Sequence, residues 1–442
     1  MPETPPETAA ISPVGSALAA EGARMYALVR ELYPICRSIT GDGVRQTLAA
    51  IERHLPAPLI RSEVPTGTKV LDWTVPNEWN IRDAWIARSD GTRVVDFRAS
   101  NLHVVSYSVG VRTRMRLAEL RPRLFTLPDR PQWIPYRTSY YAETWGFCLA
   151  QHTLDALVDD EYDVCIDATL APGHLSYGEL VLPGTESAEI LISAHVCHPS
   201  LCNDNLSSIA VAAALARALA QRPQRRFTYR FLFAPGTIGA ITWLERNRGI
   251  APRIHGGLTL TCLGDGSPLT YKRTIGGATA IDRAAQLVLR DRKRGDHVID
   301  FFPYGYDERQ YNSPGFRAPV GSLMRGRHGE FPEYHTSADD LSFVSAERLA
   351  DSLEVLCDVA EVLESNRAYR NLAPFGEPQL GARGLYRATG GTDIPDLTLA
   401  MLWVLTLSDG DHCLVDIAER SALPYASIRA AADLLRAGAL LG

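Results

Sequence analysis

The segment Glu189–Ser208 reads EILISAHVCHPSLCNDNLSS, and it decides how the rest of the chain is interpreted. Its first part, EILISAHV, is a short apolar run of the kind that forms a buried strand. Its last part overlaps LSSIAVAAALARALA, whose Ala- and Leu-rich composition predicts a helix. His195, His198 and Asp204 therefore lie at the carboxyl end of a predicted strand and on the loop that follows it. Parallel α/β sheets place their ligand sites at this position.

The alternation of strand and helix continues along the chain. FTYRFLFAP (227–235) and GGLTLTCLG (256–264) predict two further strands, and helices are predicted over Ala280–Arg294 and Ala346–Glu364. Strands that alternate with helices form a mostly parallel sheet with helices on its faces. We therefore expect an α/β fold with a mostly parallel sheet flanked by helices.

Changes in sequence texture divide the chain into four parts. Residues 16–63 are predicted to begin the main domain with helices, and residues 183–370 to complete it. Between them, residues 64–182 consist of short β-rich runs separated by Pro and Gly, which predicts an inserted β-domain that covers or shapes a site. Residues 385–442 read helix, turn (DGDHC), helix, turn, helix, which is the pattern of a winged-helix module.

The charge of the chain bears on its partners. The formal net charge is −6, from 45 basic and 51 acidic residues, so no overall positive field is available to recruit nucleic acid. The predicted winged-helix module carries mainly Arg420, Arg429 and Arg436, and we expect it to serve packing or dimerisation rather than DNA binding. Homo-oligomer formation and a regulatory role that uses DNA both stay open as alternatives.

The chain shows none of the sequence features of a membrane or secreted protein. A run of about 18 apolar residues is absent, so no membrane span is predicted. The N-terminal sequence MPETPPETAAISPVGSALAAEG lacks the basic and then apolar pattern of a signal peptide. The 8 cysteines form no CxxC pair, which is typical of reduced thiols. Together these features predict a cytoplasmic protein.

A second polar cluster, FPEYHTSADDL (331–341), supplies a further candidate metal ligand. Like the first cluster, it places a histidine beside acidic residues at the boundary of a predicted helix. Neutral imidazole and carboxylate groups suit zinc, and three protein ligands leave one coordination position for water in a catalytic site. We therefore predict a zinc site formed by His195, Asp204 and His335.

Several motifs resemble a known family of enzymes. NDNLS (203–207) and HTSAD (335–339) are similar to metal-binding motifs of zinc aminopeptidases of the bacterial leucyl aminopeptidase type. The resemblance implies the same three zinc ligands, with Asp339 as a residue that orients them. It also implies hydrolysis of an amide bond in a small peptide or aminoacyl conjugate. The whole chain resembles an aminopeptidase-like family with an inserted β-domain and a C-terminal winged helix, on the segments VPNEWNIRDAWI, NLHVVSYS, IPYRTSYY, WGFC, HVCHPSLCNDNLS, YGYDERQYNSPG and PEYHTSADD.

Two positions depart from the family pattern. Where the family has PETIG, this chain has PGTIG, so Gly236 replaces a glutamate expected as general base or ligand. Thr261 stands where two-zinc aminopeptidases have a further aspartate, and the nearby Asp265 is out of register, so the resemblance implies one zinc ion. Three alternatives follow: zinc activates water with Glu333 or Glu308 as the base, the site performs a different acyl chemistry, or it binds a ligand without turnover. The substitution Gly236→Glu is expected to separate a weakened hydrolase from the other roles.

Further polar residues complete the predicted site. In YGYDERQYNSPG (304–315), Asp307 is a candidate for binding a substrate ammonium, and Arg309 for binding a carboxylate or carbonyl. The alternative is an ion-pair network that stabilises the loop. His198 is a candidate substrate contact, and Tyr334 is a candidate for stabilising an oxyanion through its hydroxyl group.

Overall fold

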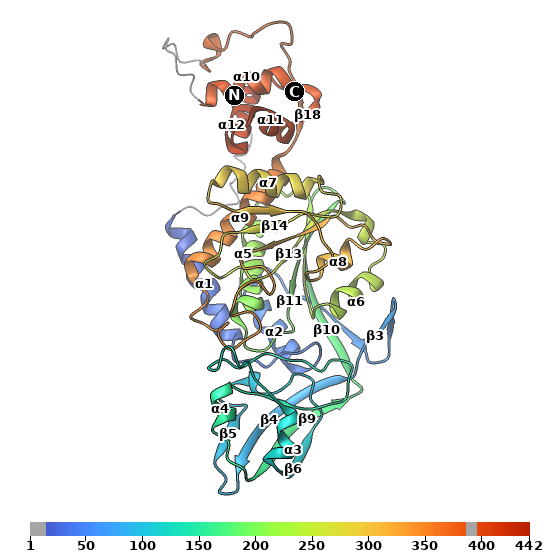
Figure 1. Ribbon diagram of the computed structural model, residues 1–442. Coiled ribbons are helices and arrows are strands. Elements are labelled where there is room, and N and C mark those ends of the chain that lie inside the picture. The colour runs from blue at the N-terminus through green and yellow to red at the C-terminus, as the bar shows by residue number, and fades with distance from the viewer. Residues whose placement is uncertain (1–14, 386–395) are drawn as a thin grey trace.

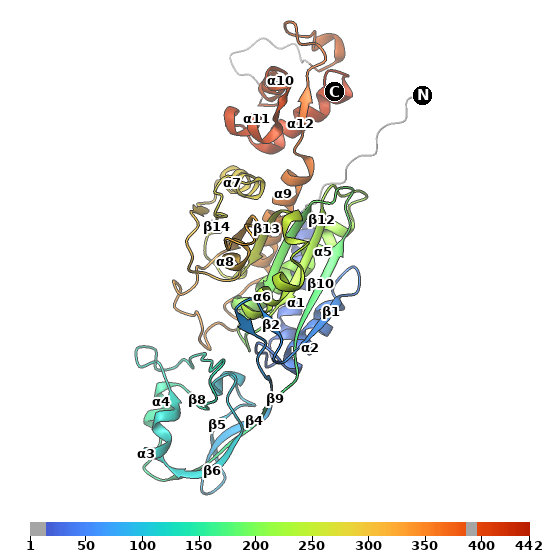
Figure 2. The ribbon, with the colours of Figure 1, turned by 90° about the vertical axis from the view of Figure 1, so that its right-hand side faces the viewer.

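The computed structural model describes residues 15–385 and 396–442 of the chain. The predicted absence of a signal peptide concerns mainly the first 14 residues, which lie outside the described part. Three bodies follow one another along the molecule: a C-terminal helical unit, a central α/β core and a β-rich insert at the opposite end (Figure 1). Figure 2 shows the same order from the side.

The core is built on an 8-stranded sheet in the order β1-β10-β12-β11-β13-β16-β14-β15. Its central strands β12, β11, β13 and β16 run parallel, whereas β1, β10 and β14 each pair antiparallel with their inner neighbour. The predicted α/β class with a mostly parallel sheet is therefore confirmed. The strands are β1 (Ile60–Pro65), β10 (His174–Leu182), β11 (Glu189–His195), β12 (Thr228–Ala234), β13 (Ile254–Leu260), β14 (Thr270–Lys272), β15 (His297–Ile299) and β16 (Val320–Met324).

Helices cover both faces of this sheet. Helices α1, α2, α5, α7 and α9 contribute to one large apolar cluster on one face, and α6 and α8 pack against the other face. The Ala-rich helix α5 is buried along most of its length, because its small side chains allow close approach to the sheet. No helix within the described ranges is both long and apolar enough to cross a bilayer. The helices are α1 (Ser16–Leu32), α2 (Asp42–Glu52), α5 (Ser208–Ala220), α6 (Ile238–Arg246), α7 (Ala280–Arg292), α8 (Glu308–Tyr311) and α9 (Ala346–Ser365).

The β-rich insert has its own 4-stranded antiparallel sheet, in the order β5-β4-β9-β6, and its own apolar core. Strand β10, which the sequence assigned to the insert at 64–182, lies instead between β1 and β12 in the central sheet. Six consecutive residues of β10 are buried. A continuous apolar run predicts a strand that is buried on both faces, but it does not show which of two sheets the strand joins. The elements of the insert are β2 (Lys69–Val70), β3 (Trp73–Thr74), β4 (Glu78–Arg88), β5 (Arg93–Asp96), β6 (Val111–Arg116), α3 (Leu117–Leu120), β7 (Leu124–Phe125), β8 (Phe147–Cys148), α4 (Gln151–Asp155) and β9 (Glu161–Ala171).

The described part of the C-terminal unit contains α10 (Asp396–Leu407), α11 (Leu414–Ser421) and α12 (Tyr425–Ala437). Strand β18 (Asp409–Cys413) pairs antiparallel with β17 (Ala368–Arg370). The segment DGDHC, predicted as a turn, is therefore a strand, and the unit begins with β17 rather than at residue 385. The partner of β18 lies far upstream in the sequence, so the local pattern did not indicate the pairing.

Candidate metal centre

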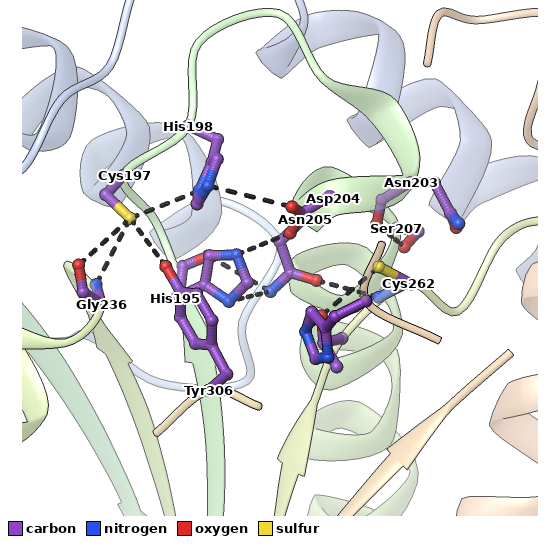
Figure 3. A network of polar contacts seen from close by, with 12 residues as sticks. His195, Cys197, His198, Asn203, Asp204, Asn205, Ser207, Gly236, Cys262 and Tyr306 are labelled. Carbon is purple, nitrogen blue, oxygen red and sulfur yellow. Dashed lines mark hydrogen bonds and ion pairs between the residues drawn. The ribbon is translucent and has the colours of Figure 1, made fainter. Parts of the chain in front are cut away.

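The carboxylate of Asp204 lies among three imidazole rings. Its Oδ1 is 2.9 Å from His195 Nε2, and its Oδ2 is 3.0 Å from His335 Nε2. His198 Nε2 lies 3.8 Å from the same Oδ2. His195 is the last residue of β11, and Asp204 belongs to the loop that leads into α5 (Figure 3). The structure thus brings the three predicted ligands together, with His198 as a fourth neighbour.

Asp204 stays ionised although it is fully buried. Burial alone would raise the pKa of its carboxyl group, but the imidazoles of His198, His195 and His335 hold that pKa well below its usual value. The side chain of His335 is 33% exposed, whereas those of His195 and His198 are buried. The cluster therefore contains a buried carboxylate anion, and solvent reaches the cluster at His335.

This set of donor atoms fits a zinc ion. The ligand atoms of His195, His198 and Asp204 all lie within 4.8 Å of one another, and His335 approaches the second carboxylate oxygen. Among the described residues, Asp204 has no Lys or Arg as an ion-pair partner. Imidazole nitrogen and carboxylate oxygen are established zinc ligands, and a bound cation would add positive charge beside a buried carboxylate whose partners in the described part of the chain are imidazoles.

Asp339 fixes the loop that carries Asp204. Its carboxylate accepts hydrogen bonds from the backbone amides of Asn203 and Asp204, the latter at 2.9 Å. Its backbone carbonyl accepts a third bond, from the amide of Cys202 at 2.9 Å. Asp339 therefore holds the backbone of the ligand loop, whereas the sequence left open which ligand it orients.

Two asparagines on either side of Asp204 tie this loop to the end of β13. Asn203 donates from Nδ2 to Asp265 Oδ2 at 2.7 Å. Asn205 donates to a backbone carbonyl at the end of β13 and accepts from a backbone amide just beyond it. The sequence interpretation missed both roles, although NDN contains two amides that can donate and accept at once.

The insert holds the loop that carries His335. The amide of Tyr136 donates to the carbonyl of His335 at 2.8 Å, and the amide of Ser337 donates to the carbonyl of Ile134 at 2.8 Å. The Tyr136 ring lies 5.1 Å from the His335 ring, edge to face. His335 has a left-handed backbone with φ of 54°, which this pairing stabilises. The predicted oxyanion residue Tyr334 stacks on the His335 ring, with 4.0 Å between the ring centroids.

The space beside Gly236 is filled by Tyr306. A Cβ atom on Gly236 would lie 2.1 Å from a ring carbon of Tyr306 and 2.4 Å from its hydroxyl oxygen. The Tyr306 ring also lies over His195, with 3.9 Å between the ring centroids, and its hydroxyl group is 3.3 Å from Cys197 Sγ (Figure 3). The substitution Gly236→Glu alone is therefore a poor test of a missing base, because Tyr306 occupies the position of the new side chain.

The predicted acidic candidates Glu308, Asp307 and Glu333 form no hydrogen bond or ion pair with the cluster among the described residues. Glu308 forms a buried ion pair with Lys272, 2.6 Å between Oε1 and Nζ, which is the ion-pair alternative left open by the sequence. Asp307 is buried, its Oδ1 has no hydrogen-bond partner, and burial together with neighbouring Glu308 raises its pKa well above the usual value. Within the described ranges, the carboxylate of Glu333 forms no hydrogen bond or ion pair, and Arg309 donates only to a backbone carbonyl.

Comparisons with known proteins agree with this architecture. A family model described as "Domain of unknown function (DUF4910)" matches residues 26–366, and a winged helix-turn-helix model matches residues 367–442. The chain belongs to the DUF4910 family. A relative from Clostridium acetobutylicum is 50% identical over 415 residues, which cover 94% of this chain and 95% of the relative. Its name refers to polysaccharide biosynthesis and an aminopeptidase-like domain.

Solved structures show the same fold for this DUF4910 protein. A crystal structure of a protein from Clostridium acetobutylicum that is named as a peptidase has a TM-score of 0.91 at 48% identity, and covers 96% of this chain and 97% of its own. The zinc aminopeptidase BSAP from Bacillus subtilis has a TM-score of 0.56 at 13% identity, over 78% of this chain and 94% of its own. The predicted aminopeptidase-like fold with a C-terminal winged helix is therefore confirmed.

Proposed function

We propose that this DUF4910 protein is a mononuclear zinc-dependent amide hydrolase that acts on a small peptide or aminoacyl conjugate. The observation that carries the proposal is the buried Asp204 carboxylate, which lies between the Nε2 atoms of His195 and His335 at the end of a central strand. The aminopeptidase-like fold supports hydrolysis of an amide bond, and the name of the Clostridium relative favours a step in biosynthesis.

The residues around the cluster favour one ion. In the described part of the chain, the group around Asp204 is the only set of three or more His, Cys, Asp or Glu placed to hold a metal. Thr261, at the end of β13, bonds instead to His328, 3.2 Å between Oγ1 and Nε2. Asp265, the nearest further carboxylate by sequence, is used by Asn203.

Each side chain has a defined part in the proposed reaction. His195, Asp204 and His335 would hold the ion, with His198 beside them, and the bound zinc would polarise the carbonyl group and lower the pKa of water. The hydroxyl groups of Tyr306 and Tyr334 are donors suited to an oxygen that gains negative charge. Gly236 has no side chain and so supplies no carboxylate base. We therefore expect slower turnover than in enzymes that have a glutamate at this position.

Metal analysis tests the proposal. Protein purified at neutral pH is expected to contain about one zinc ion per chain, and His195→Ala or His335→Ala is expected to remove it. His255→Ala is a matched control, because His255 stacks on Phe227 away from the cluster. Folded protein that binds no zinc at neutral pH would contradict the proposal.

Ligand binding without turnover is the second candidate function. It is favoured by Gly236 and by Tyr306, which fills the space of the missing side chain. Zinc-loaded protein that binds amides but releases no product would support it. A DNA-directed role is less favoured, because Arg429 pairs with Glu361 and Arg436 lies over the ring of Tyr369. Binding of duplex DNA with an affinity that falls steeply as the salt concentration rises would instead favour the DNA-directed role.

A further inference from the structure

A cavity of about 250 Å³ opens beside the metal-ligand cluster, and its wall is mostly aromatic. His198 and His335 of the cluster line it, and the rings of Trp73, Tyr136, Tyr140, Tyr141 and Tyr306 form much of the remaining wall. Its volume is below the range of about 300–1,000 Å³ that is typical of pockets for whole drug-sized ligands. The cavity is therefore suited to one ring-sized part of a substrate.

Contacts within the protein hold parts of the aromatic wall in place. The hydroxyl groups of Tyr136 and Tyr140 are hydrogen-bonded to each other at 2.9 Å; Tyr136 is buried and Tyr140 is half-buried. Nearer the surface, the rings of Trp73 and Tyr141 lie 5.6 Å apart. Trp73 is 42% exposed and Tyr141 is 54% exposed. Large aromatic groups left exposed at the mouth of a cavity indicate a binding surface for a partly apolar group.

The wall carries no formal charge apart from its histidines. None of the residues that line the cavity is Asp, Glu, Lys or Arg. Asp307, the expected partner of a substrate ammonium, is buried but does not line the cavity, and Glu308 is paired with Lys272.

A positively charged amino group would be poorly placed in this cavity. A divalent ion held by neutral imidazoles and the single carboxylate of Asp204 would leave a net positive centre beside the cavity. An ammonium group in the cavity would meet that charge without a carboxylate to offset it. A free amino terminus, which defines an aminopeptidase substrate, is therefore disfavoured here.

We propose that the cavity binds the uncharged ring of a sugar whose amino group carries the scissile acyl group. This inference rests on the proposed amide hydrolysis, and it assigns an N-acylated amino sugar as the substrate in place of a small peptide or aminoacyl conjugate. A pyranose has a flat apolar face that suits Trp73 and Tyr141, and its hydroxyl groups suit the phenol groups of Tyr136 and Tyr140.

The reaction is a hydrolysis and needs no further reactant. The oxygen of water forms a bond to the acyl carbon, and the bond between that carbon and the sugar nitrogen breaks. The nitrogen takes up both protons of the water and leaves as an ammonium group. The products are a carboxylate and a protonated amino sugar.

Matched substrates test this inference on the zinc-loaded full-length protein. We expect acetate release from N-acetylated hexosamines with a kcat/KM at least about tenfold above that for leucine amide and for acetanilide. Leucine amide carries a free ammonium, and acetanilide carries an aryl ring without hydroxyl groups. Preference for either of these two compounds would overturn the sugar assignment while leaving amide hydrolysis intact. Absence of bound zinc would instead count against the proposed function itself.

A binding measurement separates recognition from turnover. Saturation-transfer NMR with N-acetylglucosamine is expected to show binding to the zinc-loaded protein, and Trp73→Ala is expected to reduce it at least about tenfold with zinc content unchanged. Trp85→Ala is the matched control, because Trp85 lies in the sheet of the insert, contacts Arg93 and does not line the cavity. Equal binding by the two variants, or no binding by the parent protein, would overturn the inference.

Discussion

The two sides of the site are held by different kinds of contact. On the core side, Asp204 is fixed by buried carboxylates, amides and backbone groups, such as Asp339 and Asn203. On the insert side, aromatic rings and a short backbone pairing hold the cavity wall, with Tyr136 as the residue that links it to His335. The difference teaches that charge and hydrogen bonding position the Asp204 carboxylate of the proposed metal site, while ring packing shapes the cavity beside it.

This comparison predicts larger effects on stability from changes on the core side than from changes at the insert. The largest is expected for Lys272→Met, which leaves the buried Glu308 carboxylate without its partner. We expect a loss of about 3–5 kcal/mol in the free energy of unfolding, measured by urea denaturation. Lys69→Met, at an exposed lysine of the insert, is the control and is expected to change stability little. If Lys272→Met changes the free energy of unfolding only slightly, the predicted difference in stability between the core side and the insert side is wrong.

The next effect is expected at Gly236. Gly236→Glu places a side chain into the ring of Tyr306, and overpacking of this kind lowers the free energy of unfolding by about 1–3 kcal/mol. The double variant Gly236→Glu/Tyr306→Ala is expected to recover part of that loss. Gly249→Glu is the control, since a Cβ atom there meets no atom within 4 Å. Equal stability of the single and double variants would show that Tyr306 moves freely.

A smaller effect is expected from Asp339→Asn. An amide cannot accept hydrogen bonds with both of its terminal atoms, so one of the backbone amides of Asn203 and Asp204 would lose its acceptor. Residues that orient metal ligands typically contribute about 10–100-fold to metal affinity, and we expect a loss in this range in a chelator-competition assay. Asp340→Asn is the control, because Asp340 bonds locally to Ser342. Unchanged zinc affinity in Asp339→Asn would contradict the role of the loop.

The smallest effect is expected where the insert meets the His335 loop. Ser337→Ala removes the hydroxyl group that accepts from the amide of Ile134 at 2.9 Å. We expect a loss of about 1 kcal/mol in the free energy of unfolding, with zinc content retained. Ser342→Ala, at an exposed hydroxyl group of the same loop region, is the control. Loss of zinc in Ser337→Ala would mean that the insert side also governs the metal.

The sequence predicted the core side of the site better than the insert side. His195 and Asp204 follow one buried strand, so the rule that ligand sites lie at the carboxyl ends of parallel strands placed them together. The prediction that His335 lies near these two residues rests on the family resemblance and on the polar cluster that contains His335. Each of these patterns spans only a few consecutive residues, so each can be recognised from the sequence alone.

The remaining features depend on contacts between distant segments. Tyr306 lies 70 residues after Gly236 in the sequence, and no local sequence pattern shows that its ring fills the space beside that glycine. The same holds for the aromatic wall, in which Trp73 and Tyr141 meet from separate parts of the insert. Strand β10 and strand β18 were misassigned for a similar reason, because their partners are set by tertiary structure.

The backbone pairing between Tyr136 and His335 has a thermodynamic consequence. The same short segment carries a ring of the cavity wall and binds the loop of a proposed metal ligand. Occupancy of the cavity and occupancy of the metal centre therefore share one structural support. If a ligand in the cavity tightens this support and raises the affinity for zinc by some factor, zinc must raise the affinity for that ligand by the same factor.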